Sequence, residues 1–420
     1  MMSDTTLHRI DDFARPHLPP LIRTANLLGR PFANSLSLDP DRLLESARRK
    51  TRLEDFGDNV FQEPFRVLMH ALEHEAGLHP FGRFAVRSLV LQLLATRLRA
   101  EALVQRYPEI LQQEVAPPII IAGLPRTGTT HLHNLISQDA NLRSLPYWES
   151  LEPVPDCEDP RQPPEPDPRR KRCEQGLRLV HSAMPLFPLM HEMEPDARHE
   201  EIQLLAAGFS TMLFESSYCV PSYARWYQKS DQTAAYEYLK RMMQILQWLD
   251  GRPRRWVLKS PQHLEQLPVI LRVFPNCSLV QTHRDPVHVT ASLATMVAYG
   301  MRLGCGAIDP HAVGHYWAER VEAMLRASIS DRPGVPDHQV SDVRFHDFMA
   351  DEVGTIERIY GRANQPFTED TRRGIERYRA DHQRGRMGRI DYRLDTLGLD
   401  SEERRQALRF YSERFGVSGT

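Results

Sequence analysis

The residues with the clearest chemical potential form a loop at 123–130, which reads Gly-Leu-Pro-Arg-Thr-Gly-Thr-Thr. It follows three isoleucines at 119–121 and precedes an amphipathic segment at 131–137. A buried strand, a glycine-bearing loop and a helix in this order surround an anion with backbone N–H groups and a helix N-terminus. Gly128 allows the backbone to approach closely, and Arg126 adds a full positive charge. The pattern predicts an anion site, and a tight turn without a ligand is the alternative.

This loop differs from that of nucleoside triphosphatases, which requires Lys after the last glycine. Thr129 occupies that place here, and the charge lies earlier, at Arg126. The run Leu-Pro-Arg-Thr-Gly-Thr-Thr resembles the 5′-phosphosulfate loop of sulfotransferases that use 3′-phosphoadenosine 5′-phosphosulfate (PAPS). The resemblance implies that five residues bind the 5′-phosphosulfate group of this donor: Arg126, Thr127, Gly128, Thr129 and Thr130.

A second charged segment, from Arg284 to Ser292, follows the apolar stretch at 278–282. A helix that begins near Pro286 places Ser292 about two turns along, which can bring both side chains near one anion. Taken alone, Arg284 could equally belong to a structural pair. In the sulfotransferase family, an arginine and a serine at this spacing hold the 3′-phosphate of the donor. The resemblance implies that role for Arg284 and Ser292.

Lys259 ends a third apolar stretch, Trp-Val-Leu at 256–258. A lysine at a strand end inside a cleft is costly to bury unless an anion pairs with it. Lys-Ser-Pro after such a strand resembles the segment that lies near the transferred sulfuryl group in several sulfotransferase branches. We therefore expect Lys259 and Arg126 to be catalytic. His263 is a candidate acid or base, and a surface or helix-capping histidine is the alternative.

Two acidic segments are candidates for the acceptor side of the site. Glu149 lies shortly after the loop helix, where several sulfotransferase branches carry a glutamate base, and a salt-bridged glutamate is the alternative. The segment 193–201 is dense in carboxylates but lacks the matched Glu-x-x-His pairs of a dinuclear metal site. It predicts a helix start that contributes to the acceptor site. No role follows from the sequence for His191 and His199.

The segment 372–393 contains eight arginines, among them Arg386 and Arg389 in a glycine-bearing run. The family often closes the 3′-phosphate site with a basic late loop, and the resemblance implies this role for Arg386 and Arg389. Acidic residues such as Glu376 and Asp381 are interspersed, so a solvated charged face explains the segment equally well.

Strands that alternate with helices must position these residues. Apolar stretches at 119–121, 256–258, 278–282 and, more weakly, 340–345 predict parallel strands with helical crossovers. Ligands of such sheets bind beyond the carboxyl ends of the strands, where the charged residues lie. We therefore expect an α/β fold of the P-loop type, with three layers around a central, mostly parallel sheet.

The chain divides into two expected parts. Residues 1–115 predict a helical N-terminal extension, with helices near 64–76 and 81–106, and they resemble the extension of a bacterial sulfotransferase branch. Residues 116–420 form the expected sulfotransferase domain. The proline-rich segment 153–168 predicts an irregular surface loop, and an insertion is a simpler interpretation than a lid.

The amino-acid composition argues against several other classes of protein. The 420 residues are 41% hydrophobic and 26% charged, which excludes a mostly disordered chain, and the net charge of −2 argues against general nucleic-acid binding. No apolar run reaches the length of about 18 residues that a membrane-spanning helix needs, and we find no secretory signal. The five cysteines are scattered without zinc-ligand spacing, which favours a reducing cytoplasm.

These observations predict a PAPS-dependent sulfotransferase that acts without a metal. An acceptor hydroxyl or amine would lose its proton to Glu149 or His263 and attack sulfur in line, while Arg126 and Lys259 stabilise the departing phosphate. The acceptor would be a small molecule, a lipid or a sugar, and a homodimer is left open as the assembly. The alternatives are a P-loop kinase, which would need the loop lysine and a Mg²⁺-binding acid, and a non-catalytic adenine-nucleotide binder.

No single motif in the sequence identifies the acceptor. Aromatic and methionine side chains between 187 and 226 could line an apolar acceptor pocket, although core positions are the simpler interpretation. These side chains are Phe187, Met190, Phe209, Met212, Tyr218, Tyr223 and Trp226.

Overall fold

The centre of the protein is a parallel five-stranded sheet with the strand order β3-β6-β2-β7-β8. The computed structural model describes residues 6–382 and 388–417. The strands are β2 (Ile119–Ala122), β3 (Leu142–Arg143), β6 (Arg255–Lys259), β7 (Ser278–His283) and β8 (Val340–Arg344). Every pairing between them is parallel, which confirms the predicted α/β fold.

The short apolar strands form because both faces of the sheet are covered. Ile120 pairs with Leu258 on β6 and Leu279 on β7, and these three side chains belong to one hydrophobic core. Ile119 and Ile121 belong to a second core on the opposite face. Since each fully buried isoleucine contributes roughly 1.5–3 kcal/mol, an uninterrupted β-branched run is the expected sequence of such a strand.

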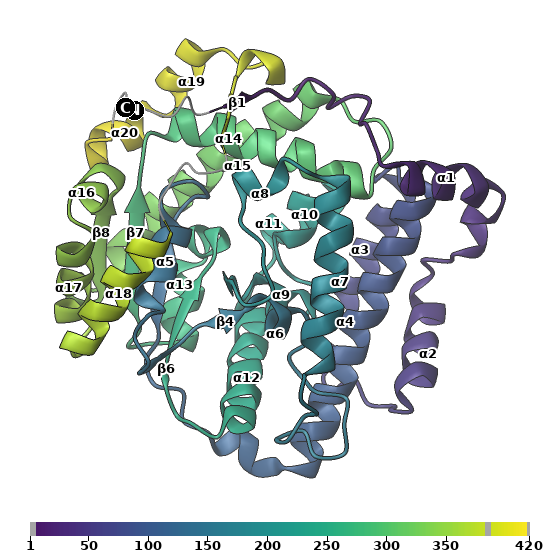
Figure 1. Ribbon diagram of the computed structural model, residues 1–420, viewed down its shortest axis with the longest axis horizontal. Helices are drawn as coiled ribbons and strands as arrows, with labels where there is room; N and C mark the ends of the chain where they lie inside the picture. Colours follow the sequence, from purple (N-terminus) through teal and green to yellow (C-terminus); the bar gives the residue numbers. More distant parts are fainter. Residues whose placement is uncertain (1–5, 383–387, 418–420) are drawn as a thin grey trace.

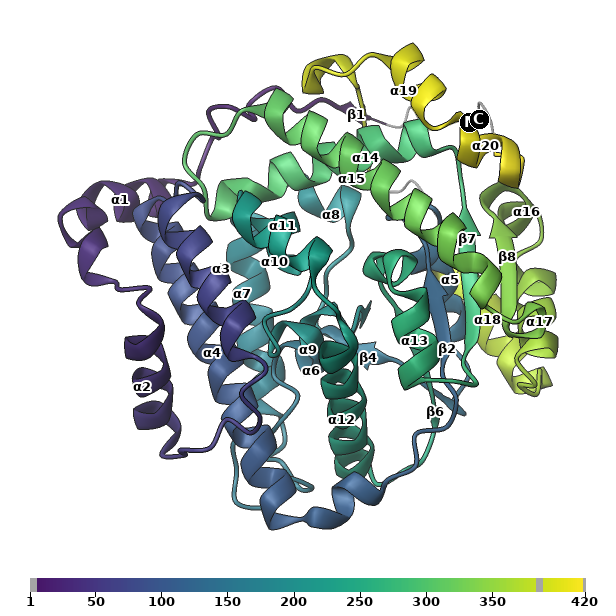
Figure 2. The same cartoon turned by 180° about the vertical axis from the view of Figure 1, so that it is seen from behind.

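Helices form the two outer layers of the fold (Figures 1 and 2). The second core lies under α5 (Thr129–Ile136), α16 (Phe345–Ala350), α17 (Glu352–Arg362) and α18 (Glu369–Asp381). The larger core lies under α12 (Thr233–Asp250), α13 (Leu267–Val273), α14 (Pro286–Gly300) and α15 (Pro310–Asp331). Shorter helices complete this core: α8 (Phe187–Met190), α9 (Ile202–Ala206), α10 (Leu213–Ser217), α11 (Pro221–Lys229) and α20 (Arg409–Phe415). Of the other short helices, α6 (Tyr147–Leu151) belongs to a small separate cluster, and α19 (Ser401–Ala407) has no buried residue.

The N-terminal part is helical, as predicted, and lies away from the sheet in Figure 1. Its helices are α1 (Pro20–Gly29), α2 (Pro40–Thr51), α3 (Gln62–His74) and α4 (Pro80–Arg106). They do not form a core of their own, because Phe65 and Leu94 belong to the same cluster as Leu258. The boundary near residue 115 stays a prediction. Among the described residues, no helix combines the length and apolar character needed to cross a membrane.

A small antiparallel ribbon stands beside the sheet. It consists of β4 (Leu145–Pro146), which precedes α6 directly in the chain, and β5 (Arg198–His199), which follows α8. The proline-rich segment runs between α6 and α7 (Pro168–Ala183), mostly as bends and turns. A second ribbon pairs β1 (Leu7–His8) with β9 (Arg389–Ile390), a strand that precedes the last two helices. The first ribbon positions the acidic segment next to the strand ends.

Candidate active site

The segment after β2 forms a tight loop that leads into α5. Two of its residues have a left-handed backbone, with φ of 71° at Arg126 and 91° at Gly128. Turns of this kind direct successive N–H groups toward one side, a geometry that binds anions. The first N–H groups of α5 have no carbonyl partner within the helix and add to the same site. At Gly128, a Cβ atom would lie 3.2 Å from the ring of Phe345, a tight contact, and the left-handed φ would strain any larger residue.

Two buried threonines fix the loop against the neighbouring strand. The hydroxyl of Thr127 donates to the carbonyl of Leu124 at 2.6 Å and lies 2.6 Å from the hydroxyl of Thr282 on β7. Because Thr127 is buried, its side chain shapes the loop and does not line the cavity described next. Thr129 and Thr130 do line that cavity.

A single cavity of about 1320 Å³ collects half of the predicted site residues. Its walls come from the loop after β2, the ends of β6 and β7, the segment around β5 and the chain after residue 387. The structure brings six of the predicted residues to it: Arg126, Gly128, Thr129, Thr130, Arg284 and Arg389. Arg386 lies outside the described residues.

Arg126 and Arg284 lie at the carboxyl ends of adjacent strands and are linked. The guanidinium of Arg284 donates to the carbonyl oxygen of Arg126 at 2.8 Å, and the guanidinium of Arg126 donates to that of Met190 at 2.7 Å. The ring of Tyr392 lies 5.7 Å from the Arg126 guanidinium carbon, and the ring of Phe345 lies 4.2 Å from that of Arg284. Two fixed cations therefore face one cavity, each supported by an aromatic ring.

Lys259 lies directly behind the cavity wall, where its side chain is 2% exposed. Its ammonium forms an ion pair with Glu200 and lies 3.4 Å from the hydroxyl of Thr130 in the first turn of α5. Its backbone N–H donates to the carboxylate of Glu201 at 2.8 Å. Glu200 and Glu201 of the acidic segment 193–201 thus both contact the last residue of β6. Glu200 lines the cavity, although sequence reasoning gave it no individual role. The density of carboxylates at 193–201 was the only sequence signal for it.

His263 has a different environment from the one predicted. It is fully buried, with Nε2 bonded to the carboxylate of Glu201 and Nδ1 lying 2.7 Å from the hydroxyl of Tyr236. Burial raises the pKa of Glu201, but the contacts with His263 and with backbone N–H groups outweigh it and hold the pKa below its ordinary value. His263 therefore supports Glu201 from behind and does not line the cavity.

Two other predicted residues also lie outside the cavity lining. Glu149 pairs with Arg143 through both carboxylate oxygens at 3.1 Å, and it faces a second, smaller cavity. Ser292 is buried on α14, where its hydroxyl donates to the carbonyl of Val289 at 3.1 Å. The side chain of Ser292 therefore points into the helix packing, although its neighbour Leu293 lines the cavity.

The opposite wall of the large cavity is apolar. Of the seven aromatic and methionine candidates, Phe187, Met190, Met212 and Tyr218 line it, whereas Phe209, Tyr223 and Trp226 pack in the core. Further lining residues are Met184, Ile202, Leu213, Leu293, Met296, Val297 and Trp317.

Two histidines, His191 and His199, also line the cavity. Burial, reinforced by nearby cationic groups that include Lys259, lowers the pKa of both imidazoles. They are therefore neutral near pH 7 and can exchange hydrogen bonds without adding charge.

The sequence and the fold match those of a known class of enzyme. Residues 117–369, more than half of the chain, match the sequence profile of the Sulfotransferase family. The chain belongs to the Sulfotransferase family and is a sulfotransferase enzyme. Membership removes the kinase alternative.

Particular relatives agree with this membership. The chain is 26% identical over 299 residues to omega-hydroxy-beta-dihydromenaquinone-9 sulfotransferase Stf3 of Mycobacterium tuberculosis, covering 69% of this chain and 71% of that protein. Crystal structures of sulfotransferase STF9 from Mycobacterium avium and STF1 from Mycobacterium tuberculosis H37Rv have TM-scores of 0.80 and 0.76 to this protein. Each is 28% identical in sequence; the first alignment covers 90% of this chain and 97% of the other, and the second covers 87% and 97%.

Proposed function

We propose that this protein transfers the sulfuryl group of PAPS to a hydroxyl group of a largely apolar small-molecule or lipid acceptor. One observation carries the proposal. A single cavity has three arginines and the loop after β2 at one end and a wall of apolar side chains at the other, with the carboxylate of Glu200 in its lining. This arrangement suits a charged donor and an apolar acceptor that meet at a base.

The charged end fits a donor with phosphate groups at both ends. The left-handed loop and the first turn of α5 suit the 5′-phosphosulfate, and Arg126 has a buried Nε without a hydrogen-bond partner among the described residues. Arg284 and Arg389 suit the 3′-phosphate, because arginine forks match phosphate oxygens. Arg386 and Ser292 stay predictions, and for Ser292 the bond to Val289 supports a role in the helix packing.

The donor supplies an electrophilic sulfur and a phosphate leaving group. We assign the proton transfer to Glu200, which would accept the proton of the acceptor hydroxyl as its oxygen bonds to sulfur. The bond between sulfur and the 5′-phosphate oxygen breaks, and its electron pair stays on that phosphate. Arg126 and the loop N–H groups would stabilise the growing charge. Lys259 can contribute because its ammonium already contacts both Glu200 and Thr130. Glu149 and His263 have no part in this scheme.

The acceptor class follows from the apolar wall. Side chains such as Phe187, Met212 and Trp317 offer little to the many hydroxyl groups of a sugar, whereas they suit an extended hydrocarbon. The name of the relative Stf3 specifies a hydroxylated menaquinone as that protein's acceptor, which supports the same class here. An amine acceptor, a cytoplasmic location and a homodimer stay predictions.

The test is direct transfer in solution. The purified protein is incubated with PAPS and a panel containing a prenyl alcohol, a sterol, a phenol and a hexose, and sulfated products are measured by mass spectrometry. We expect product from the apolar alcohols and none from the hexose. Binding of adenosine 3′,5′-bisphosphate is measured in parallel by calorimetry. Absence of this binding would contradict the donor, and sulfation of the hexose alone would contradict the acceptor class.

A further inference from the structure

The second cavity, of about 390 Å³, lies across the β4–β5 ribbon from the active-site cavity. Successive residues of β5 face opposite sides, since Arg198 lines the second cavity and His199 lines the active-site cavity. The same alternation occurs at the start of α6, where Tyr147 lines the active-site cavity and Trp148 and Glu149 line the second one. The ribbon and α6 therefore form a wall between two separate sites.

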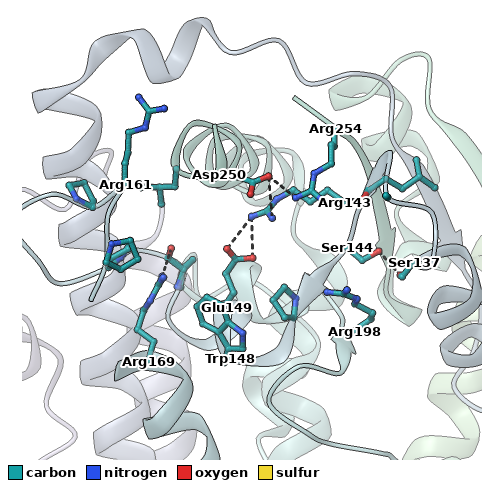
Figure 3. A pocket seen from close by; sticks show the side chains of 18 of the residues that line it. Ser137, Arg143, Ser144, Trp148, Glu149, Arg161, Arg169, Arg198, Asp250 and Arg254 are labelled. Carbon is teal, nitrogen blue, oxygen red and sulfur yellow. Dashed lines mark hydrogen bonds and ion pairs between the residues drawn. The ribbon is translucent and has the colours of Figure 1, made fainter. Parts of the chain in front are cut away.

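Five arginines and three acidic residues line the second cavity. Figure 3 shows that the arginines come from several segments, including the ribbon, β3 and the chain before β6. The arginines are Arg143, Arg161, Arg169, Arg198 and Arg254, and the acids are Asp139, Glu149 and Asp250.

Most of these charges are matched in pairs. Arg143 contacts Glu149 at 3.1 Å and Asp250 at 3.9 Å, and Arg254 contacts Asp250 at 2.6 Å. The side chains of Arg198 and Arg161 are the exceptions. Neither has a hydrogen bond or an ion pair with another described residue, although the guanidinium carbon of Arg161 lies 5.1 Å from the ring of Trp248. The buried Nε atoms of Arg143 and Arg254 also lack a hydrogen-bond partner among the described residues. The guanidinium groups of this cavity therefore carry more N–H donors than its carboxylates accept hydrogen bonds from.

The pKa of Arg198 agrees with a surplus of positive charge in this cavity. Burial lowers the pKa of Arg198, and the positive charges of Arg254 and Arg143 lower it further against the opposing effect of Asp196 and Glu149. An anion placed among these guanidinium groups would relieve their repulsion.

We propose that the second cavity binds a phosphate group, either as inorganic phosphate or as the phosphate ester of a small molecule. Guanidinium groups that converge from separate segments suit the several oxygens of a phosphate better than the two oxygens of a carboxylate. The proline-rich segment supplies the outer wall, since Pro153, Pro155, Pro160 and Pro163 line the cavity. Because proline fixes the backbone angle φ, ordering this wall costs little conformational entropy. The proline-rich segment 153–168, which the sequence predicts to be an insertion, thus encloses the proposed phosphate site.

The test measures binding of inorganic phosphate and glycerol 3-phosphate by calorimetry at constant ionic strength. The full-length protein is compared with Arg198→Gln, Arg198→Lys and a matched control, Arg170→Gln. Arg170 lies near Arg198 but is exposed, pairs with Asp196 and does not line the cavity. We expect Arg198→Gln to weaken binding at least about tenfold, Arg198→Lys to weaken it less, and Arg170→Gln to stay within about twofold. All measurements are repeated with saturating adenosine 3′,5′-bisphosphate, and melting temperatures without ligand confirm folding.

Each outcome decides the proposal. Tighter binding of the ester supports a phosphate ester as the ligand, and equal binding supports free phosphate. Binding that is lost when adenosine 3′,5′-bisphosphate is present, or that is equal in wild type and Arg198→Gln, would place the phosphate in the active-site cavity and overturn the proposal. Absence of any phosphate binding by the wild type would overturn it too. Failure of adenosine 3′,5′-bisphosphate to bind would contradict only the proposed donor, because the comparison of the variants at Arg198 does not depend on it.

Discussion

The two cavities on either side of the β4–β5 ribbon each contain a glutamate paired with a cation, yet they suit different tasks. In the active-site cavity Glu200 pairs with Lys259 and faces an apolar wall. In the second cavity Glu149 pairs with Arg143 among further arginines. Lysine presents a mobile point charge, whereas arginine forms a rigid two-point contact. The difference teaches that proximity in sequence does not place a carboxylate in the active-site cavity: Glu149 follows the loop after β2 closely but lies outside that cavity, whereas Glu200, much later in the chain, lines it.

The largest expected effect separates the two glutamates. Glu200→Gln removes the proposed base and should lower kcat for an apolar alcohol by about 10²- to 10⁴-fold. The matched variant Glu149→Gln should stay within about twofold, since its side chain does not line the active-site cavity. Both are measured under saturating PAPS and acceptor. A reversed order of the two effects would return the role of base to Glu149.

The paired cations give the next test. Lys259→Met should lower kcat by about 10²- to 10³-fold, by comparison with the loss of a single oxyanion donor. Lys229→Met, at an exposed lysine on α11, is the control and should leave kcat unchanged. If Lys259→Met instead raised KM for PAPS while kcat was preserved, Lys259 would serve donor binding and not the chemical step.

A substitution at the charged end of the cavity, where we place the donor, should change the KM for PAPS. Arg284→Gln should raise KM for PAPS by about tenfold or more with a smaller change in kcat, because it removes a contact with a non-reacting phosphate. Arg344→Gln provides a control, since Arg344 ends the neighbouring strand β8 without lining the cavity. Equal effects of the two substitutions on KM would mean that Arg284 acts through the general positive field.

The smallest expected effect concerns stability in acid. The pKa of Glu201 is lower in the folded protein than its ordinary value of 4.5, so its ionisation stabilises the fold above that value. This contribution should be lost as the pH falls below about 4.5 toward the folded pKa. Unfolding by urea across this range should show a weaker pH dependence in Glu201→Gln than in the wild type. An unchanged dependence would mean that other carboxylates dominate.

Much of the scaffold could be predicted because its signals are local. The isoleucines at 119–121, the glycine at Gly128 and Arg284 after β7 mark strand ends directly in the sequence. Parallel strands bring their carboxyl ends to one edge, so the meeting of Arg126 and Arg284 followed from topology alone. The apolar residues were harder, since Phe187 in the cavity and Phe209 in the core have the same chemical type.

The sequence by itself determined the parallel sheet, the phosphate loop and the class of enzyme, because short apolar strands and glycine turns depend on neighbouring residues. The tertiary structure alone decided which carboxylates line the active-site cavity. Residues of the acidic segment alternate across a two-residue ribbon, so Arg198 and His199 face different cavities. Which of those faces meets the phosphate loop depends on how the ribbon packs beside β6, and that packing involves residues far apart in the chain.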